Sequence, residues 1–157
     1  MKSPFNYLML FSLLMLGACN QSSEKKGDTT SATALDSANQ QCFLAVDGVD
    51  SAKLNLITAK DGKITGALLI NYLEKGDSDG TILGKFKDDT LFVDYTFRIG
   101  TLNKTFYKNP LAFLKKDGIL MMGVGQIETF LGKSSFVKDK PISFDRGRFQ
   151  FSSAPCK

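Results

Sequence analysis

The chain has 157 residues, the size of a single domain, and carries 20 Lys and Arg against 16 Asp and Glu. A net charge of +4 spread along the sequence excludes the concentrated basic face that binds nucleic acid, so no nucleic-acid partner is expected. The absence of histidine removes the usual catalytic triads and the commonest ligand of zinc and copper.

The first eighteen residues have the composition of a secretory signal peptide. Lys2 gives a positive start, and residues 7–16 are apolar except for Ser12. A run this short cannot span a hydrocarbon core of ~30 Å, which needs about 20 apolar residues. We therefore expect residues 1–18 to direct export and to be removed.

The signal peptide ends in Leu16-Gly17-Ala18-Cys19, which resembles the lipobox of bacterial lipoproteins. Small residues before the cysteine let the backbone lie extended in a peptidase, and the Cys19 thiol takes a diacylglyceryl group. Because two or more acyl chains hold a protein at a bilayer, the resemblance implies a lipid anchor at Cys19. In many lipoproteins of Gram-negative bacteria an Asp after the cysteine causes retention in the inner membrane; this chain has Asn20 there, so the resemblance implies the outer membrane of the cell envelope.

A polar segment follows the lipidated cysteine. Residues 20–40 contain Leu35 as their only large apolar side chain, too little to offset the entropy of ordering. We expect residues 19–40 to form the lipidated Cys19 and a flexible linker with a span of about 25 Å.

Residues 41–157 alternate between polar and apolar side chains, as in Lys53-Leu54-Asn55-Leu56 and along residues 91–99. Asp-Gly pairs between such runs favour hairpins. The pattern predicts an all-β domain, a single antiparallel up-and-down barrel of about eight strands, because closure leaves no exposed edge. Strands are expected near residues 41–47, 52–60, 63–75, 80–87, 90–99, 103–115, 118–128 and 146–154, with an irregular stretch at 129–141.

Aromatic side chains concentrate on these strands. An eight-stranded barrel is just wide enough to be filled by side chains or to hold one small ligand. The rings therefore either fill the core or line a cavity for an apolar ligand, and the sequence leaves both readings open. The candidate cavity residues are Tyr72, Tyr95, Phe97, Tyr107 and Phe113.

The two cysteines that remain after lipidation, Cys42 and Cys156, lie at the two ends of the domain. Exported proteins reach an oxidising compartment, where such a pair forms a disulfide. The chain has no C-x-x-C pair, which disfavours a thioredoxin-like redox site. We predict a structural disulfide between the first and last strands.

A set of turn and strand segments lies along the domain: residues 74–81, Gly84, residues 88–91, residues 94–97, residues 112–114 and residues 123–128. Together these segments resemble a family of small uncharacterised lipoproteins of Gram-negative bacteria. The resemblance implies a lipocalin-like barrel and supplies no catalytic residues. This chain departs from it at Lys108-Asn109-Pro110, where proline is expected to break the sixth strand unless it lies at an edge or bulge.

No pattern of polar residues indicates catalysis. Asp88-Asp89 fits a turn, and Asp77-Ser78-Asp79-Gly80 begins like a calcium loop but lacks the later Glu and the flanking helices. Asp94 and Arg98 share an outward face. We expect no enzyme activity, no cofactor and no metal.

Two non-enzymatic functions follow for the anchored barrel. The first is binding of a small apolar or amphiphilic ligand by an envelope lipoprotein. The alternative is an envelope protein-interaction module with a filled barrel, which docks to another protein as inhibitors do.

Overall fold

The computed structural model describes residues 39–156, which form an all-β structure. They belong to one compact unit, Leu35–Lys157. The strands are β1 (Gln40–Asp47), β2 (Asp50–Thr58), β3 (Lys63–Asn71), β4 (Ser78–Lys87), β5 (Thr90–Ile99), β6 (Tyr107–Lys116), β7 (Ile119–Met122), β8 (Ile127–Phe130), β9 (Lys133–Phe136) and β10 (Gln150–Ala154).

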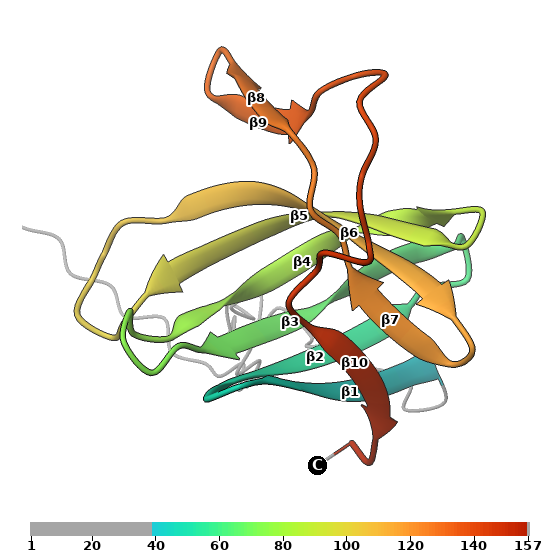
Figure 1. The fold of residues 1–157 in the computed structure, drawn as a ribbon, viewed down its shortest axis with the longest axis horizontal. Coiled ribbons are helices and arrows are strands. Elements are labelled where there is room, and N and C mark those ends of the chain that lie inside the picture. The colour runs from blue at the N-terminus through green and yellow to red at the C-terminus, as the bar shows by residue number, and fades with distance from the viewer. Residues whose placement is uncertain (1–38, 157) are drawn as a thin grey trace, which may run out of the picture. The chain divides into compact units, whose positions relative to one another are not determined.

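Eight strands close into an antiparallel barrel in the order β1-β10-β7-β6-β5-β4-β3-β2 (Figure 1). Strands β1 to β7 each pair with their neighbours in the sequence, and β10 fills the remaining gap between β7 and β1. The β8–β9 hairpin projects from the barrel (Figure 1). The prediction of an antiparallel up-and-down barrel is confirmed.

Four predicted strands, those at 41–47, 52–60, 80–87 and 90–99, agree with the structure within two residues at each end. Tight turns between consecutive strands determine where these strands begin and end. Gly48 and Gly62 adopt φ values of 63° and 78°, in the left-handed region that favours glycine, and Asp88 adopts a φ of 53°.

The strand predicted at 63–75 is too long, because β3 ends at Asn71. The backbone N–H of Leu73 donates to Oδ1 of Asp50 at 3.0 Å, so this N–H bonds to a side chain instead of a strand ladder. A side chain that lies 23 residues earlier in the sequence thus sets the loop after β3.

The strand predicted at 103–115 begins late, at Tyr107. Oδ1 of Asn103 accepts a hydrogen bond of 2.8 Å from the backbone N–H of Thr105. This local turn competes with the sheet for the backbone donors of the segment.

The strand predicted at 118–128 is wrong as one element, and so is the irregular stretch at 129–141. Strand β7 ends at Met122, and the chain then forms the β8–β9 hairpin outside the barrel. The end of β9 and the chain after it pack back on the chain after β7: a Cβ at Gly123 would lie 2.5 Å from Ile142, and one at Gly125 would lie 2.8 Å from Phe136. The chain after β7 therefore packs against this segment instead of continuing the strand, and β8 and β9 pair in a sheet of their own.

The strand predicted at 146–154 also begins late, at Gln150. The side chain of Arg148, just before it, binds Asp47 and Asp50 at the end of the barrel.

Pro110 does not break β6, contrary to the departure noted in the sequence. The carbonyl of Ala112 accepts a bond from the N–H of Gly123, so even-numbered residues of β6 direct their backbone polar groups toward β7. The backbone of Pro110 also faces the β7 side, but β7 ends at Met122 and has no residue opposite Pro110. On its other side Pro110 pairs with Asp94 of β5, at a position where the ladder needs no N–H from Pro110.

The barrel interior is built from the alternate positions of the strands. Three of these positions are glycines, and a Cβ at Gly66 would lie 1.8 Å from the carbonyl oxygen of Asn55. Such positions let neighbouring strands approach closely where a barrel bends. The buried core comprises Phe43, Ala45, Ala52, Leu54, Leu56, Ile64, Leu68, Ile70, Ile82, Leu91, Val93, Tyr95, Phe97, Phe113, Leu120, Phe149 and Phe151.

Candidate functional site

The five aromatic residues that the sequence singles out fall into two groups. Tyr95 and Phe97 of β5 are buried, and their rings stack with centroids 4.5 Å apart. Tyr107, which is 40% exposed, extends this group, with its centroid 5.6 Å from that of Phe97. Phe113 and Tyr72 belong to the second group, where they contact the rings of two further phenylalanines.

The second group surrounds two phenylalanines that the sequence analysis did not select. Phe151 is fully buried and meets the Phe113 ring edge-on at 5.7 Å. Phe149 lies 6.1 Å from Phe151 and 6.5 Å from Tyr72. Aromatic pairs at these separations stabilise a fold by more than the burial of their apolar surface alone. Strands β6 and β10, the residue after β3 and the residue before β10 therefore contribute rings to one packed cluster.

The hydroxyl group of Tyr95 is satisfied inside the protein. It donates to the carbonyl oxygens of Leu68 and Ser78, which lie 3.0 and 2.9 Å away. Burial raises the pKa of Tyr95 well above its ordinary value, so this group stays protonated as a donor.

A polar network lies at the end of the barrel beside the β1–β2 turn. Arg148 Nη2 lies 2.7 Å from Oδ2 of Asp50, and Nε donates to Asp47. The hydrogen bond from the Leu73 N–H, and then that from Arg148, hold the pKa of the Asp50 carboxyl below its usual range. The Arg148 guanidinium also lies 6.0 Å from the ring centroid of Tyr72. This network ties the segment before β10 to β1 and β2.

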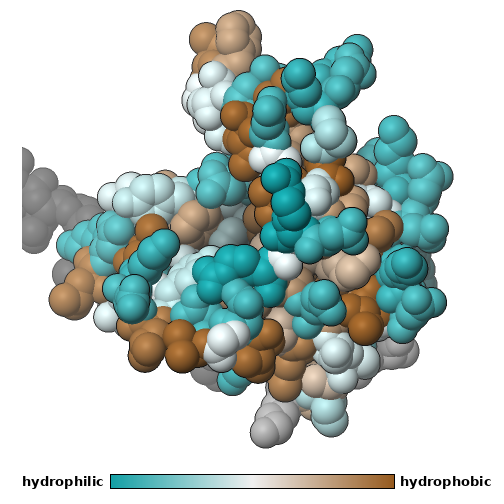
Figure 2. Space-filling view, in the orientation of Figure 1, coloured by the Kyte–Doolittle hydropathy of each residue, from teal (hydrophilic) through white to brown (hydrophobic). Residues whose placement is uncertain are grey.

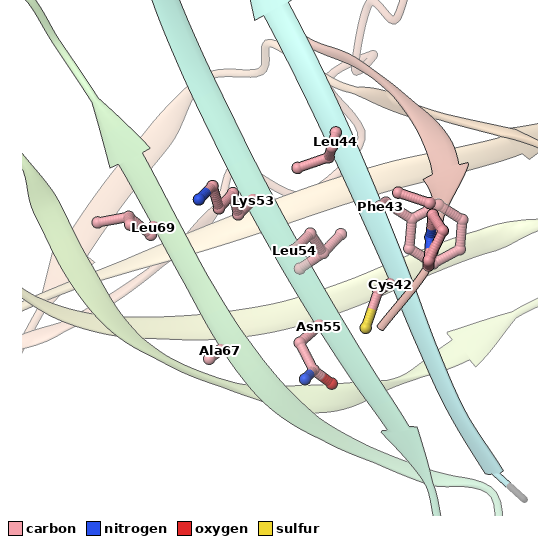
Figure 3. A pocket seen from close by; sticks show the side chains of 10 residues that line it. Cys42, Phe43, Leu44, Lys53, Leu54, Asn55, Ala67 and Leu69 are labelled. Carbon is pink, nitrogen blue, oxygen red and sulfur yellow. The ribbon is translucent and has the colours of Figure 1, made fainter. Parts of the chain in front are cut away.

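An apolar groove of about 290 Å³ lies on the outer wall of β1, β2 and β3, beside the end of β10 (Figure 3). Leu44, Lys53 and Leu69 pair across the three strands in one row. Cys42, Asn55 and Ala67 form the next row. The groove is lined by Cys42, Phe43, Leu44, Lys53, Leu54, Asn55, Ala67, Leu69, Ala154 and Pro155.

Asn55 is the unusual member of this groove. Its Oδ1 is buried and has no hydrogen-bond partner within the part of the chain that the structure describes. Buried polar atoms are normally hydrogen-bonded, so this oxygen needs a specific explanation. The alternation at residues 53–56 places Lys53 and Asn55 on one face, but no local pattern indicates that Leu44 and Leu69 flank Lys53.

The predicted disulfide is present: Cys42 and Cys156 are bonded, with Cα atoms 5.2 Å apart. Their bond joins the start of β1 to the residues after β10. Cys19, the predicted signal peptide and most of the predicted linker lie outside the described residues.

The β8–β9 hairpin carries exposed apolar side chains at its tip. Phe130 is 75% exposed and Leu131 is 90% exposed. Figure 2 shows tan and brown side chains on this projection, at the top of the view. Exposed contiguous apolar surface of this kind is typical of an interaction site.

Within residues 39–156, no three His, Cys, Asp or Glu side chains gather as metal ligands would. Over the same residues, no helix has the length and apolar character to cross a membrane. Comparisons of the chain with protein-family models, curated proteins and solved structures find no match.

Proposed function

We propose that this chain is a lipid-anchored, non-enzymatic protein of the bacterial cell envelope that acts by docking to another envelope protein. The observation that carries the proposal is the packing of the barrel interior. Phe113 and Phe151 are fully buried, and the Tyr95 ring stacks on that of Phe97. Side chains that occupy the interior favour a function on the outer surface over a ligand held inside.

The anchor is proposed from the sequence. The segment Leu16-Gly17-Ala18-Cys19 resembles a lipobox, and the domain resembles small lipoproteins with a lipocalin-like barrel. Acyl chains on Cys19 hold such a protein at a bilayer, and Asn20 after it favours the outer membrane. The Cys42–Cys156 bond is consistent with an oxidising compartment.

The docking surface is proposed at the tip of the β8–β9 hairpin. Phe130 and Leu131 expose most of their surface, and Gly132 turns the chain beside them with a φ of 75°. Aromatic and apolar side chains that enter a partner's pocket supply much of the affinity of protein interfaces.

Site-specific photo-crosslinking in living cells tests this function. A benzophenone amino acid at Leu131 should give one discrete crosslinked product, and the product should be lost when Phe130→Ser is added. The control places the same amino acid at Lys60, in the β2–β3 turn. Equal products from both positions, or none from Leu131, would contradict docking through the hairpin.

The anchor is tested separately with the Cys19→Ser variant. Metabolic labelling with an alkyne fatty acid should mark the parent chain and leave the variant unlabelled, as an unprocessed precursor. Undiminished labelling of the variant would exclude Cys19 as the lipidation site.

A further inference from the structure

The outer-wall groove has an apolar surface that the fold holds in place. Leu44 is 48% exposed although it is a large apolar residue, and Leu69 lies across β2 from it. Ala154 and Pro155 close the side next to β1, where the bond from Cys156 to Cys42 fixes them. An alkyl chain in this groove would cover apolar surface that is now in water.

One polar atom in the floor of the groove has no hydrogen-bond donor among the described residues. Oδ1 of Asn55 is buried and accepts no hydrogen bond from any described residue. A carboxamide oxygen accepts a hydrogen bond from an N–H or O–H group, and the N–H of an amide is one such donor. Ala67, which has a small side chain, lies opposite Asn55 on β3 and also lines the groove.

Lys53 supplies the one charged side chain among the described lining residues. It lies between Leu44 and Leu69 and forms no ion pair with any described carboxylate (Figure 3). The aliphatic stem of a lysine can lie along apolar surface while its ammonium group remains in water. The free ammonium therefore favours a ligand with an anionic group next to its apolar part.

We propose that this groove binds a small amphiphile of the N-acyl amino acid class, with an alkyl chain, an amide N–H and a carboxylate. The alkyl chain lies along Leu44, Leu69 and Pro155. The amide N–H donates to Oδ1 of Asn55, and the carboxylate pairs with the ammonium group of Lys53. A volume of about 290 Å³ suits a ligand smaller than typical drug-sized molecules. This site is independent of the hairpin tip.

Three matched probes separate the contacts. N-octanoylglycine carries all three groups, octanoyloxyacetate replaces the N–H by an ester oxygen, and N-octanoylglycinamide lacks the carboxylate. The protein is the disulfide-bonded chain from Asn20 onward, which retains the compact unit Leu35–Lys157. Calorimetry gives affinities, and backbone amide NMR shifts locate the site at Cys42, Leu44, Asn55 and Ala67.

N-octanoylglycine should bind about tenfold more tightly than the ester, since one hydrogen bond to a buried acceptor is lost. Asn55→Ala should remove this preference for the amide, and Lys53→Met should remove the preference for the carboxylate over the neutral head group. Lys85→Met, on the outer wall of β4, is the matched control and should change neither. Reduction of the disulfide should weaken binding, because Pro155 is then no longer held.

Three results would overturn the assignment. The first is the absence of NMR shifts at the groove at millimolar N-octanoylglycine. The second is equal binding of the amide and the ester by the parent chain. The third is tighter binding of a peptide with a free C-terminus, such as Gly-Ala-Leu, which would assign the groove to a protein segment instead. Crosslinking at Leu131 is unaffected by any of these results, so the docking proposal stands or fails separately.

Discussion

Asp50 and Arg148 lie 98 residues apart in the sequence, and their side chains are joined at the end of the barrel with Nη2 2.7 Å from Oδ2. Asp50 is buried, and its other oxygen accepts the backbone N–H of Leu73. One carboxylate thus connects three segments: the start of β2, the loop after β3 and the chain before β10. A charge in this position makes the stability of the barrel depend on pH.

Acid should destabilise the native barrel through Asp50. Its pKa in the folded state lies below the ordinary value of 3.8, so its contribution to stability is fully present above that value. As the pH falls below 3.8, the unfolded chain binds a proton before the folded chain does, and stability decreases until the folded pKa is passed. Urea unfolding from pH 6 to pH 2 should show this loss, and Asp50→Asn should flatten the profile there. A profile with the same slope in both proteins would contradict it.

Phe97→Ala tests whether the interior is filled. Removal of a buried ring from a packed core should lower the free energy of unfolding by about 3–5 kcal/mol. Phe130→Ala, at the exposed hairpin tip, is the control and should change it by less than about 0.5 kcal/mol. An anilinonaphthalene dye should not bind the folded parent chain. Dye uptake by the parent, weakened in Phe97→Ala together with a smaller loss of stability, would instead support an internal cavity.

Reduction of the Cys42–Cys156 bond should destabilise the domain. The bond spans 114 residues, and closing a loop of about that length removes entropy from the unfolded chain. Reduction, or the double change Cys42→Ala and Cys156→Ala, should cost about 2–5 kcal/mol in urea unfolding. Before reduction, a thiol reagent should find neither cysteine reactive. Two reactive thiols in protein from the periplasm would show that the bond does not form there.

Gly66→Ala should be strongly destabilising although alanine is only one methyl group larger. The added Cβ would lie 1.8 Å from the carbonyl oxygen of Asn55, so β2 and β3 must move apart. Overpacking of this kind costs about 1–3 kcal/mol or more. Thr65→Ser, at the neighbouring position of β3, should cost less than about 0.5 kcal/mol. Equal unfolding midpoints for the two variants would mean that the strands part without cost.

The sequence alone determined the features that depend on neighbours in the chain. Alternation along residues 91–99 gave β5 with its correct ends, and Asp47-Gly48 placed the first hairpin, since strand faces and turn conformations are set within a few residues. The cysteines at the two ends indicated their bond because they are the two cysteines of the predicted barrel domain, residues 41–157. These local signals were sufficient for an antiparallel barrel.

Only the tertiary structure decided which distant residues meet. Closure of the barrel sets the register of β10 against β1 and β7, and that register brings Phe151 to Phe113 and Arg148 to Asp50. Because β7 ends early, no residue of β7 lies opposite Pro110 to accept the N–H hydrogen bond that proline lacks. The groove around Asn55 arises in the same way, because it takes side chains from three strands and the chain terminus. Such contacts depend on strand pairing across long separations, which no local pattern of residues encodes.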